Sequence, residues 1–127
     1  MNLRVFLVED SAVIRHNLTA ALEELAPVEV VGFAEDEAAA ANWIRAHGDA
    51  CDLVVIDIFL KRGSGLGFLR QTATLTNASK VILSNYATPD MRKTCLELGA
   101  HKVFDKSTEI EMLVDYCVRL EAGITGA

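Results

Sequence analysis

At residues 53–57 the chain reads Leu53-Val54-Val55-Ile56-Asp57, four consecutive apolar residues followed by an acid. An uninterrupted apolar run of this kind, rich in β-branched side chains, is typical of a strand that is buried on both faces. Strands buried in this way occur in parallel sheets that are covered by helices on both sides. The run therefore predicts an α/β protein.

The segments on both sides of this run alternate between strand-like and helix-like patterns. We expect further strands at residues 3–8, 28–33, 81–83 and 103–104. Helical periodicity, with capping and stop residues at its ends, predicts helices between Ser11 and Pro27, over residues 35–47 and 66–72, between Thr88 and Gly99, and from a Thr108-x-x-Glu111 capping box to Leu120.

Strict alternation of strands and helices favours a doubly wound parallel sheet with right-handed crossovers. Five strands at this length suit the flavodoxin-like strand order 2-1-3-4-5. The pattern uses the whole length without an internal repeat or linker, so we expect a single domain over residues 1–127 with no effector domain.

Composition excludes several classes of function. The 127 residues are 51% hydrophobic, and 12 basic against 18 acidic residues give a net charge of 12 − 18 = −6. This acidic balance disfavours direct binding to nucleic acid through phosphates. We expect no membrane insertion, no signal peptide and a cytoplasmic location. Three cysteines and three histidines are scattered without ligand spacing, which argues against a zinc site or a disulfide framework.

Apolar stripes on the first and last helices indicate which faces are buried. The first stripe is Ile14, Leu18, Ala21, Leu22 and Leu25, and the last is Ile110, Leu113, Val114, Cys117 and Leu120. Cys95 and Cys117 fall on such stripes and are expected to be small core residues. Met112 and Tyr116 lie off the last stripe, either by chance or as part of a contact surface.

Polar residues follow four of the expected strands. They are Glu9 and Asp10 after the first strand, Asp57 after the third, Ser84 after the fourth and Lys106 after the fifth. Because ligand sites in open α/β sheets form at the carboxyl ends of the strands, these side chains are expected to converge at one edge.

Three clustered carboxylates repel one another strongly unless a cation lies among them. Oxygen ligands of this type favour Mg²⁺, which binds to one or two carboxylates together with a phosphoryl oxygen. A metal ion and a lysine can stabilise charge on a transferring phosphoryl group, while an in-line carboxylate attacks it. The set therefore suits transfer of a phosphoryl group to a carboxylate.

The chain resembles response regulator receiver domains, the CheY-like family of two-component signalling. The resemblance covers essentially the whole chain and rests on Val8-Glu9-Asp10-Ser11, Val55-Ile56-Asp57-Ile58, Gly65, Leu83-Ser84-Asn85 and Asp105-Lys106-Ser107. It implies that Asp57 accepts the phosphoryl group and that Asp10 and Asp57 bind Mg²⁺. Phe59 would add its backbone carbonyl and Glu9 would act through a water, while Ser84 and Lys106 would contact the phosphoryl group.

The resemblance also implies partners. A histidine kinase or phosphotransfer domain would supply the phosphoryl group and dock near the first helix, where Val13, His16 and Asn17 lie outside the apolar stripe. A downstream protein or a second copy of the chain would dock on the face formed by the fourth helix, the fifth strand and the fifth helix.

The sequence departs from the family pattern at several positions. Val103 stands where the family has an aromatic switch residue, so either Phe104 replaces it after a local shift or the signal travels through Ser84 and the fourth helix. Ser107 stands where Pro is common. Phe59 and Tyr86 occupy positions that tune hydrolysis in the family, and their bulk predicts slow loss of the phosphoryl group.

Three other functions are consistent with parts of the pattern. A phosphohydrolase with an aspartyl nucleophile would carry a second acid two residues after Asp57, where this chain has Phe59. A flavin-binding module would need a phosphate loop after the first strand, where Glu9 and Asp10 would repel a phosphate. A degenerate receiver would act as an interaction scaffold without phosphorylation. The run of glycines at residues 63–67 lacks the spacing of a dinucleotide site, and Gly65 is expected to permit a tight turn.

Overall fold

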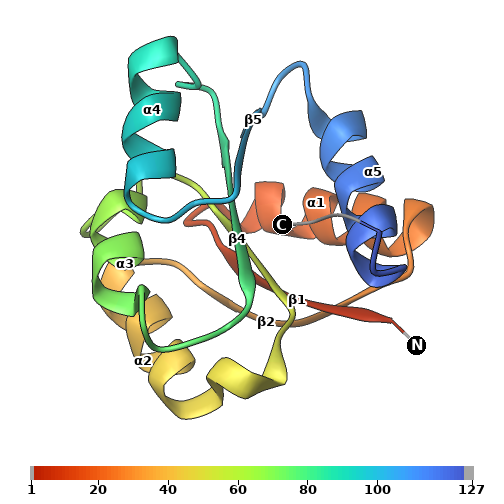
Figure 1. Ribbon diagram of the computed structural model, residues 1–127, viewed down its shortest axis with the longest axis horizontal. Helices are drawn as coiled ribbons and strands as arrows, with labels where there is room; N and C mark the ends of the chain where they lie inside the picture. Colours follow the sequence, from red (N-terminus) through yellow and green to blue (C-terminus); the bar gives the residue numbers. More distant parts are fainter. Residues whose placement is uncertain (1, 125–127) are drawn as a thin grey trace.

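Five parallel strands form one sheet in the order β2-β1-β3-β4-β5 (Figure 1). The computed structural model describes residues 2–124. Its strands are β1 (Leu3–Val8), β2 (Val28–Ala34), β3 (Leu53–Ile56), β4 (Ser79–Ser84) and β5 (Lys102–Asp105). Its helices are α1 (Ala12–Leu25), α2 (Glu37–His47), α3 (Gly65–Thr72), α4 (Pro89–Glu97) and α5 (Ile110–Glu121), with a short 3₁₀ turn, η1 (Gly48–Ala50). The predicted fold class and strand order are confirmed.

Helices cover both faces of the sheet, as the four-residue apolar run of β3 predicts. All four β3 residues are buried, and they alternate between two core clusters on opposite faces. Val54 and Ile56 pack with residues of α2, α3 and α4, while Leu53 and Val55 pack with residues of α1 and α5. Figure 1 shows these two groups of helices on opposite sides of the sheet. Burial on both sides stabilises the middle of the sheet and fixes its register.

Side-chain caps begin four of the helices in the described part of the chain. The Ser11, Asp36, Ser64 and Thr88 side chains accept hydrogen bonds from backbone N–H groups of α1, α2, α3 and α4. The expected caps of α1 and α4 are thus confirmed, whereas α2 begins two residues later than predicted. Each cap satisfies an N–H group that would otherwise lack an intrahelical partner.

The predicted capping box at Thr108 and Glu111 is wrong. Helix α5 begins at Ile110, after Glu109. The Asp105 carboxylate instead accepts hydrogen bonds from the backbone N–H groups of Ser107 and Thr108, at 2.8 and 3.2 Å. Because these bonds form a local turn, the helix begins later than the capping box predicts. Such side-chain bonds to the backbone compete with the start of a helix, and the residue pattern alone does not reveal them.

Two assignments on the helix faces are also corrected. The apolar stripe of α1 predicts burial of Leu25, but Leu25 is the last residue of the helix and is 59% exposed. The pattern of α5 places Tyr116 outside the buried stripe, but Tyr116 is buried against Phe104. Met112 is exposed, as predicted, and so are Val13, His16 and Asn17. Cys95 and Cys117 are core residues, as expected.

None of the helices in residues 2–124 combines the length and apolar character needed to cross a membrane.

Candidate functional site

Backbone hydrogen bonds bring the ends of β1 and β3 together. The N–H of Asp57 donates to the carbonyl of Val8 at 2.9 Å, and the N–H of Glu9 donates to the carbonyl of Ala34 at 3.0 Å. The sheet ladder therefore continues one residue past both strands. It places Glu9 and Asp57 side by side at the carboxyl edge of the sheet, where sites form in this fold class.

Lys106 lies between the two acids. Its Nζ is 2.7 Å from Oε1 of Glu9 and 3.0 Å from Oδ2 of Asp57. The three side chains are largely buried, with 14%, 6% and 13% of the Lys106, Glu9 and Asp57 side-chain surface exposed. The backbone N–H of Lys106 donates to the Ser84 carbonyl at 3.0 Å, which anchors the lysine to the end of β4. Charge pairs this well buried are stronger than pairs on the surface.

The second carboxylate oxygen of Glu9 is also engaged. Oε2 accepts a hydrogen bond from the backbone N–H of Ser11 at 3.0 Å, and the Ser11 hydroxyl in turn caps α1. Each oxygen of Glu9 thus has a partner within the described residues.

Asp10 completes a cluster of three acids. Oxygen atoms of Glu9, Asp10 and Asp57 lie within 4.8 Å of one another. Burial, followed by the neighbouring Glu9 carboxylate, raises the pKa of Asp10. Burial tends to lower the pKa of Lys106, but its bonds to Glu9 and Asp57 outweigh this effect and raise it. Among residues 2–124, Lys106 is the cation in ion-pair contact with the cluster, so a divalent cation with oxygen ligands fits the excess negative charge.

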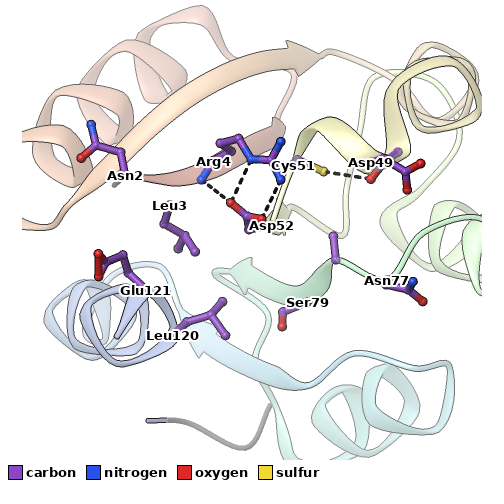
Figure 2. A pocket seen from close by; sticks show the side chains of 12 residues that line it. Asn2, Leu3, Arg4, Asp49, Cys51, Asp52, Asn77, Ser79, Leu120 and Glu121 are labelled. Atoms are coloured by element: carbon purple, nitrogen blue, oxygen red, sulfur yellow. Dashed lines mark hydrogen bonds and ion pairs between the residues drawn. The ribbon is translucent and has the colours of Figure 1, made fainter. Parts of the chain in front are cut away.

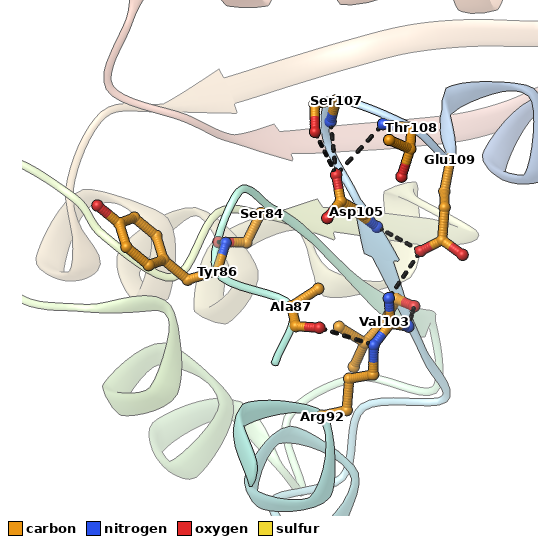
Figure 3. A network of polar contacts seen from close by, with 9 residues as sticks. All are labelled: Ser84, Tyr86, Ala87, Arg92, Val103, Asp105, Ser107, Thr108 and Glu109. Carbon is orange, nitrogen blue, oxygen red and sulfur yellow. Dashed lines mark hydrogen bonds and ion pairs between the residues drawn. The ribbon is translucent and has the colours of Figure 1, made fainter. Parts of the chain in front are cut away.

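Ser84 is the fully buried last residue of β4. It lies two residues past Ile82, which pairs with Ile56, so the strand register carries Ser84 to the level of the loop after β3. Its Oγ accepts a hydrogen bond from the backbone N–H of Tyr86 at 3.1 Å (Figure 3). The predicted serine is therefore at the same edge of the sheet as the acids.

Two aromatic side chains stand beside this edge. Phe59 lies in the loop after β3, and Tyr86 lies in the loop after β4. Their rings meet edge to face, with centroids 4.7 Å apart. They are 53% and 58% exposed. Their contact joins the two loops that flank the acids, and it leaves a large apolar surface at the solvent boundary.

Gly65 allows α3 to begin directly behind Asp57. Its N–H donates to the Ile58 carbonyl at 2.8 Å. A Cβ atom at this position would collide with the backbone carbonyl of Asp57 and would lie 2.9 Å from the Ile56 side chain. The close approach requires glycine, which confirms that Gly65 permits the tight turn.

Arg15, which the sequence patterns missed, contacts the backbone of Glu9. Its guanidinium donates to the backbone carbonyl of Glu9 at 2.8 Å and forms an ion pair with Glu35 at 3.3 Å. It also lies over the Phe33 ring, 4.2 Å from the centroid. Its one advance signal is its position one turn into the helix that follows Glu9 and Asp10, which is a weak indication.

Val103 and Phe104 point to opposite faces of β5. Val103 packs on the α4 side, and Phe104 packs against Tyr116 on the α5 side, with ring centroids 5.9 Å apart. Phe104 therefore does not take the place of the missing switch aromatic, because a residue beside Val103 must face the other way.

Arg92 of α4 fills the space beside Val103 instead. Its guanidinium donates to the carbonyls of Ala87 and Val103, at 2.9 and 2.7 Å, and to the Glu109 carboxylate at 2.8 Å (Figure 3). The Glu109 carboxylate also accepts from the N–H of Asp105 at 2.7 Å. The Arg92 guanidinium lowers the pKa of Glu109. One side chain thus joins the loop after β4 to β5 and to the start of α5.

A separate pocket opens at the amino edge of the sheet (Figure 2). Its charged lining includes Arg4 and Asp52, which bind each other at 2.9 Å. Leu3, Ser79 and Leu120 also line it. The strands run between this pocket and the acids, so it does not contribute to the acid cluster.

Comparison with known proteins places this site in a family. The family model for the response regulator receiver domain matches residues 5–117. A protein-glutamate methylesterase/protein-glutamine glutaminase of Anaeromyxobacter dehalogenans is 38% identical over 107 residues, covering 81% of this chain and 28% of that protein. A similarly named protein of Leptospira interrogans is 30% identical over 106 residues, covering 82% of this chain and 30% of that protein. The chain thus spans less than a third of the length of these relatives.

Solved structures share the fold. The receiver domain of NarL from Mycobacterium tuberculosis has a TM-score of 0.83 at 24% identity, over 96% of this chain and 98% of that one. The response regulator domain of Thermotoga maritima CheB has a TM-score of 0.77 at 21% identity, over 98% and 94%. CheY in a CheX-CheY-BeF3-Mg complex from Borrelia burgdorferi has a TM-score of 0.82 at 20% identity, over 97% and 90%. With the family match over most of its length, the chain belongs to the response regulator receiver domains.

Proposed function

We propose that this receiver accepts a phosphoryl group on Asp57 in a Mg²⁺-dependent reaction and thereby switches its binding to a partner. The observation that supports this most directly is the contact of Lys106 with both Glu9 and Asp57 beside Asp10. Four functional groups from three strand ends meet at one partly buried point. A surface acid that serves only solubility has no need of such a setting.

Asp57 is the proposed nucleophile. One of its oxygens bonds to phosphorus while the bond from phosphorus to the donor imidazole breaks, and the imidazole leaves with the electron pair of that bond. The hydrogen bond from Lys106 orients the Asp57 carboxylate before transfer. Afterwards the ammonium remains close enough to contact the phosphoryl oxygens.

Asp10 and Asp57 are the proposed direct ligands of Mg²⁺, with the Phe59 carbonyl as a third and Glu9 acting through a water. Bound Mg²⁺ would neutralise charge on the phosphoryl oxygens and hold the donor close to Asp57. The mutual repulsion of the three acids supports this assignment, since a divalent ion removes the cost of keeping them together. The named content of the Borrelia burgdorferi complex, BeF3 and magnesium, is in keeping with it.

Ser84 is the proposed sensor of the phosphoryl group. Its hydroxyl oxygen now accepts from the N–H of Tyr86, and its O–H can donate to an oxygen of a phosphoryl group on Asp57. Turning the hydroxyl toward Asp57 would free the Tyr86 N–H and bias the loop after β4 toward a second conformation. Of the two ways in which the signal could travel, this is the one through Ser84 and α4. Phe104 is not suited to the other, because it packs on the face of the sheet opposite to α4.

Phe59 and Tyr86 are proposed to slow hydrolysis of the phosphorylated protein. Their rings meet edge to face in the loops that follow β3 and β4, the strands that lead to Asp57 and Ser84. We propose that their bulk hinders the approach of water to the phosphorus. We expect the phosphorylated form to persist for longer than seconds after the donor is removed.

The proposed donor is a histidine kinase or phosphotransfer domain that docks on the exposed α1 residues Val13, His16 and Asn17. The proposed output surface is the face of α4, β5 and α5, which has a groove with Met112 exposed and both acids and bases along it. Its partner is a downstream protein or a second copy of the chain. We further propose that residues 1–127 catalyse only their own phosphorylation and dephosphorylation, and that the protein works in the cytoplasm.

The test is direct labelling. The protein is incubated with Mg²⁺ and acetyl phosphate, and intact mass is measured for the wild type and for Asp57→Asn, with EDTA in a parallel sample. One added phosphoryl group in the wild type, lost in the variant and with EDTA, is expected. Labelling of Asp57→Asn at the wild-type level would overturn the assignment. No labelling of a wild type that binds Mg²⁺, from acetyl phosphate or a phosphorylated histidine kinase, would favour the scaffold alternative.

A further inference from the structure

We propose that Arg15 is a positioning residue for the metal-binding pair Glu9 and Asp10, and that it sets the affinity of the site for Mg²⁺. This inference rests on the proposed function, because it concerns the same acid cluster. Arg15 does not touch the cluster's carboxylate oxygens. It acts through the backbone carbonyl of Glu9, to which its Nη1 donates at 2.8 Å.

The carbonyl that Arg15 holds belongs to the peptide group between Glu9 and Asp10. Because a peptide group is planar, holding its oxygen restrains the plane that contains the Cα atoms of both Glu9 and Asp10. Glu9 is further restrained by Ser11 and Lys106, whereas Asp10 is the acid of the cluster without an ion pair in residues 2–124. Arg15 therefore restrains the backbone next to Asp10, the acid whose side chain has the fewest other restraints.

Several contacts hold Arg15 itself in place. Its side chain is only 11% exposed, and its guanidinium lies over Phe33 at 4.2 Å. Its second nitrogen pairs with Glu35, whose other oxygen binds Lys61 of the loop after β3. Glu35 and Lys61 are 38% and 50% exposed, and such pairs contribute little. The carbonyl bond and the stacking on Phe33 are thus the main restraints, with Glu35 as a lesser one.

Positioning and simple charge make opposite predictions for the loss of Arg15. If only charge mattered, removing a cation next to three acids would strengthen the attraction for Mg²⁺. If Arg15 positions Asp10, removing it would weaken binding, because the ligands must then be ordered at the moment of binding. The sign of the change in affinity therefore separates the two roles.

The experiment is a calorimetric titration with MgCl2 of the wild type, Arg15→Gln, Arg15→Lys and Arg45→Gln. Arg45 lies on α2, where its side chain bonds Asn42 and Gln71 away from the acids, so Arg45→Gln matches the change in net charge. We expect Arg15→Gln to bind Mg²⁺ about tenfold more weakly. Arg45→Gln should stay within about twofold of the wild type, and Arg15→Lys should fall between the two.

A second measurement separates positioning from general damage. The rate of labelling by acetyl phosphate is followed against Mg²⁺ concentration. For Arg15→Gln, the half-saturating Mg²⁺ concentration should rise about tenfold while the rate at saturating Mg²⁺ stays near that of the wild type. Structural damage would lower the saturating rate and the melting temperature together.

Equal or tighter Mg²⁺ binding by folded Arg15→Gln would overturn the inference. If that variant does not fold, as judged by circular dichroism, Arg15→Lys decides. Wild-type affinity in this variant would equally overturn the inference, since an ammonium cannot both donate to the Glu9 carbonyl and lie flat over Phe33 as the guanidinium does. Failure of the wild type to bind Mg²⁺ at all is a different result, which would reject the proposed metal site and with it the inference.

Discussion

The ring of Phe104 stands edge-on to the ring of Tyr116, with their centroids 5.9 Å apart, on the face of the sheet that α1 and α5 cover. Both residues are nearly fully buried. The pair therefore belongs to the core. Because Val103 packs on the opposite face of the sheet, with α4, Phe104 cannot replace an aromatic residue at position 103. A purely structural role for Phe104 leads to a simple prediction.

Replacing Phe104 by Ala should lower the free energy of unfolding by about 3 to 5 kcal/mol, because it removes a buried ring and leaves a cavity beside Tyr116. Urea unfolding followed by circular dichroism measures the loss. Val118→Ala on the exposed side of α5 serves as the control and should change little. Loss of Mg²⁺ affinity in the folded Phe104→Ala protein would contradict a purely structural role for Phe104.

Asp10→Asn should stabilise the protein in the absence of Mg²⁺, by about 1 kcal/mol. The variant removes one of three clustered carboxylates, whose repulsion reaches about 4 kcal/mol at 4 Å and an effective dielectric near 20 before relaxation. Urea unfolding with EDTA, and again with MgCl2, measures the effect. Mg²⁺ should stabilise the wild type but not the variant.

The control for Asp10→Asn is Asp90→Asn, which removes an acid from the first turn of α4. A negative charge at a helix N-terminus is favourable, so this variant should be slightly less stable than the wild type. A loss of stability in both variants would contradict the charge repulsion assigned to the cluster.

The pair Arg4 and Asp52 gives a pH-dependent contribution to stability. Its hydrogen bond from Arg4 lowers the pKa of Asp52 in the folded protein. A carboxyl group with a lowered folded pKa stabilises the protein above its unfolded pKa, near 3.9, and this contribution disappears as pH falls through the folded pKa. Because Asp52 is 38% exposed, solvent screening limits the effect to about 0.5 kcal/mol.

Urea unfolding of the wild type and Asp52→Asn should therefore differ at pH 7, and the difference should shrink as the pH falls below the ordinary aspartate pKa of about 3.9. Asp115→Asn is the matched control, since Asp115 and Arg119 form an exposed pair at 3.5 Å on α5. That variant should differ little from the wild type over the same pH range. A difference between wild type and Asp52→Asn that grows as the pH falls would have the wrong sign for this mechanism.

Apolar runs in the sequence predict the strand bounds well where a run is uninterrupted, and less well where a charged residue lies inside the strand. The bounds of β1 and β3 match the prediction, and both strands end where an acid follows the apolar residues. β4 begins two residues earlier than predicted, at Ser79, since Lys80 breaks the apolar run. The aliphatic stem of Lys80 is buried, while its Nζ reaches the Thr72 carbonyl at the end of α3.

The candidate site divides in the same way. Acids, serine and lysine at the ends of strands could be predicted to converge, because strand order and parallel direction determine where those ends lie. Arg15 and Arg92 could not be predicted, because both act through backbone carbonyls, which leave no trace in the residue pattern. The burial of Tyr116 was missed because its partner, Phe104, lies on another element.

Arg92→Met should lower the free energy of unfolding by about 1 to 2 kcal/mol, because the Ala87 and Val103 carbonyls and the Glu109 carboxylate lose a charged donor. Hydrogen exchange gives the more specific readout. Without Arg92, the Glu109 carboxylate is held less firmly, so the Asp105 amide that donates to it should exchange faster.

The neighbouring variant Lys93→Met is the control for Arg92→Met, because Lys93 is exposed on the same helix. It should change neither the unfolding free energy nor the exchange of the Asp105 amide. Equal protection of that amide in Arg92→Met and in the wild type would show that Arg92 does not hold α4, β5 and α5 together.

Gly65 and Gly67, at the start of α3, should differ sharply in their tolerance of substitution by alanine. A Cβ at Gly65 meets the backbone carbonyl of Asp57, which cannot move without shifting the acid itself. A Cβ at Gly67 meets only the carboxylate end of Glu37, a flexible side chain that can turn away. Gly65→Ala should therefore cost about 1 to 3 kcal/mol of stability and also weaken Mg²⁺ binding, whereas Gly67→Ala should leave Mg²⁺ binding unchanged. Urea unfolding and calorimetric titration with MgCl2 test both variants, and unaltered Mg²⁺ affinity in Gly65→Ala would mean that the turn behind Asp57 does not position its carboxylate.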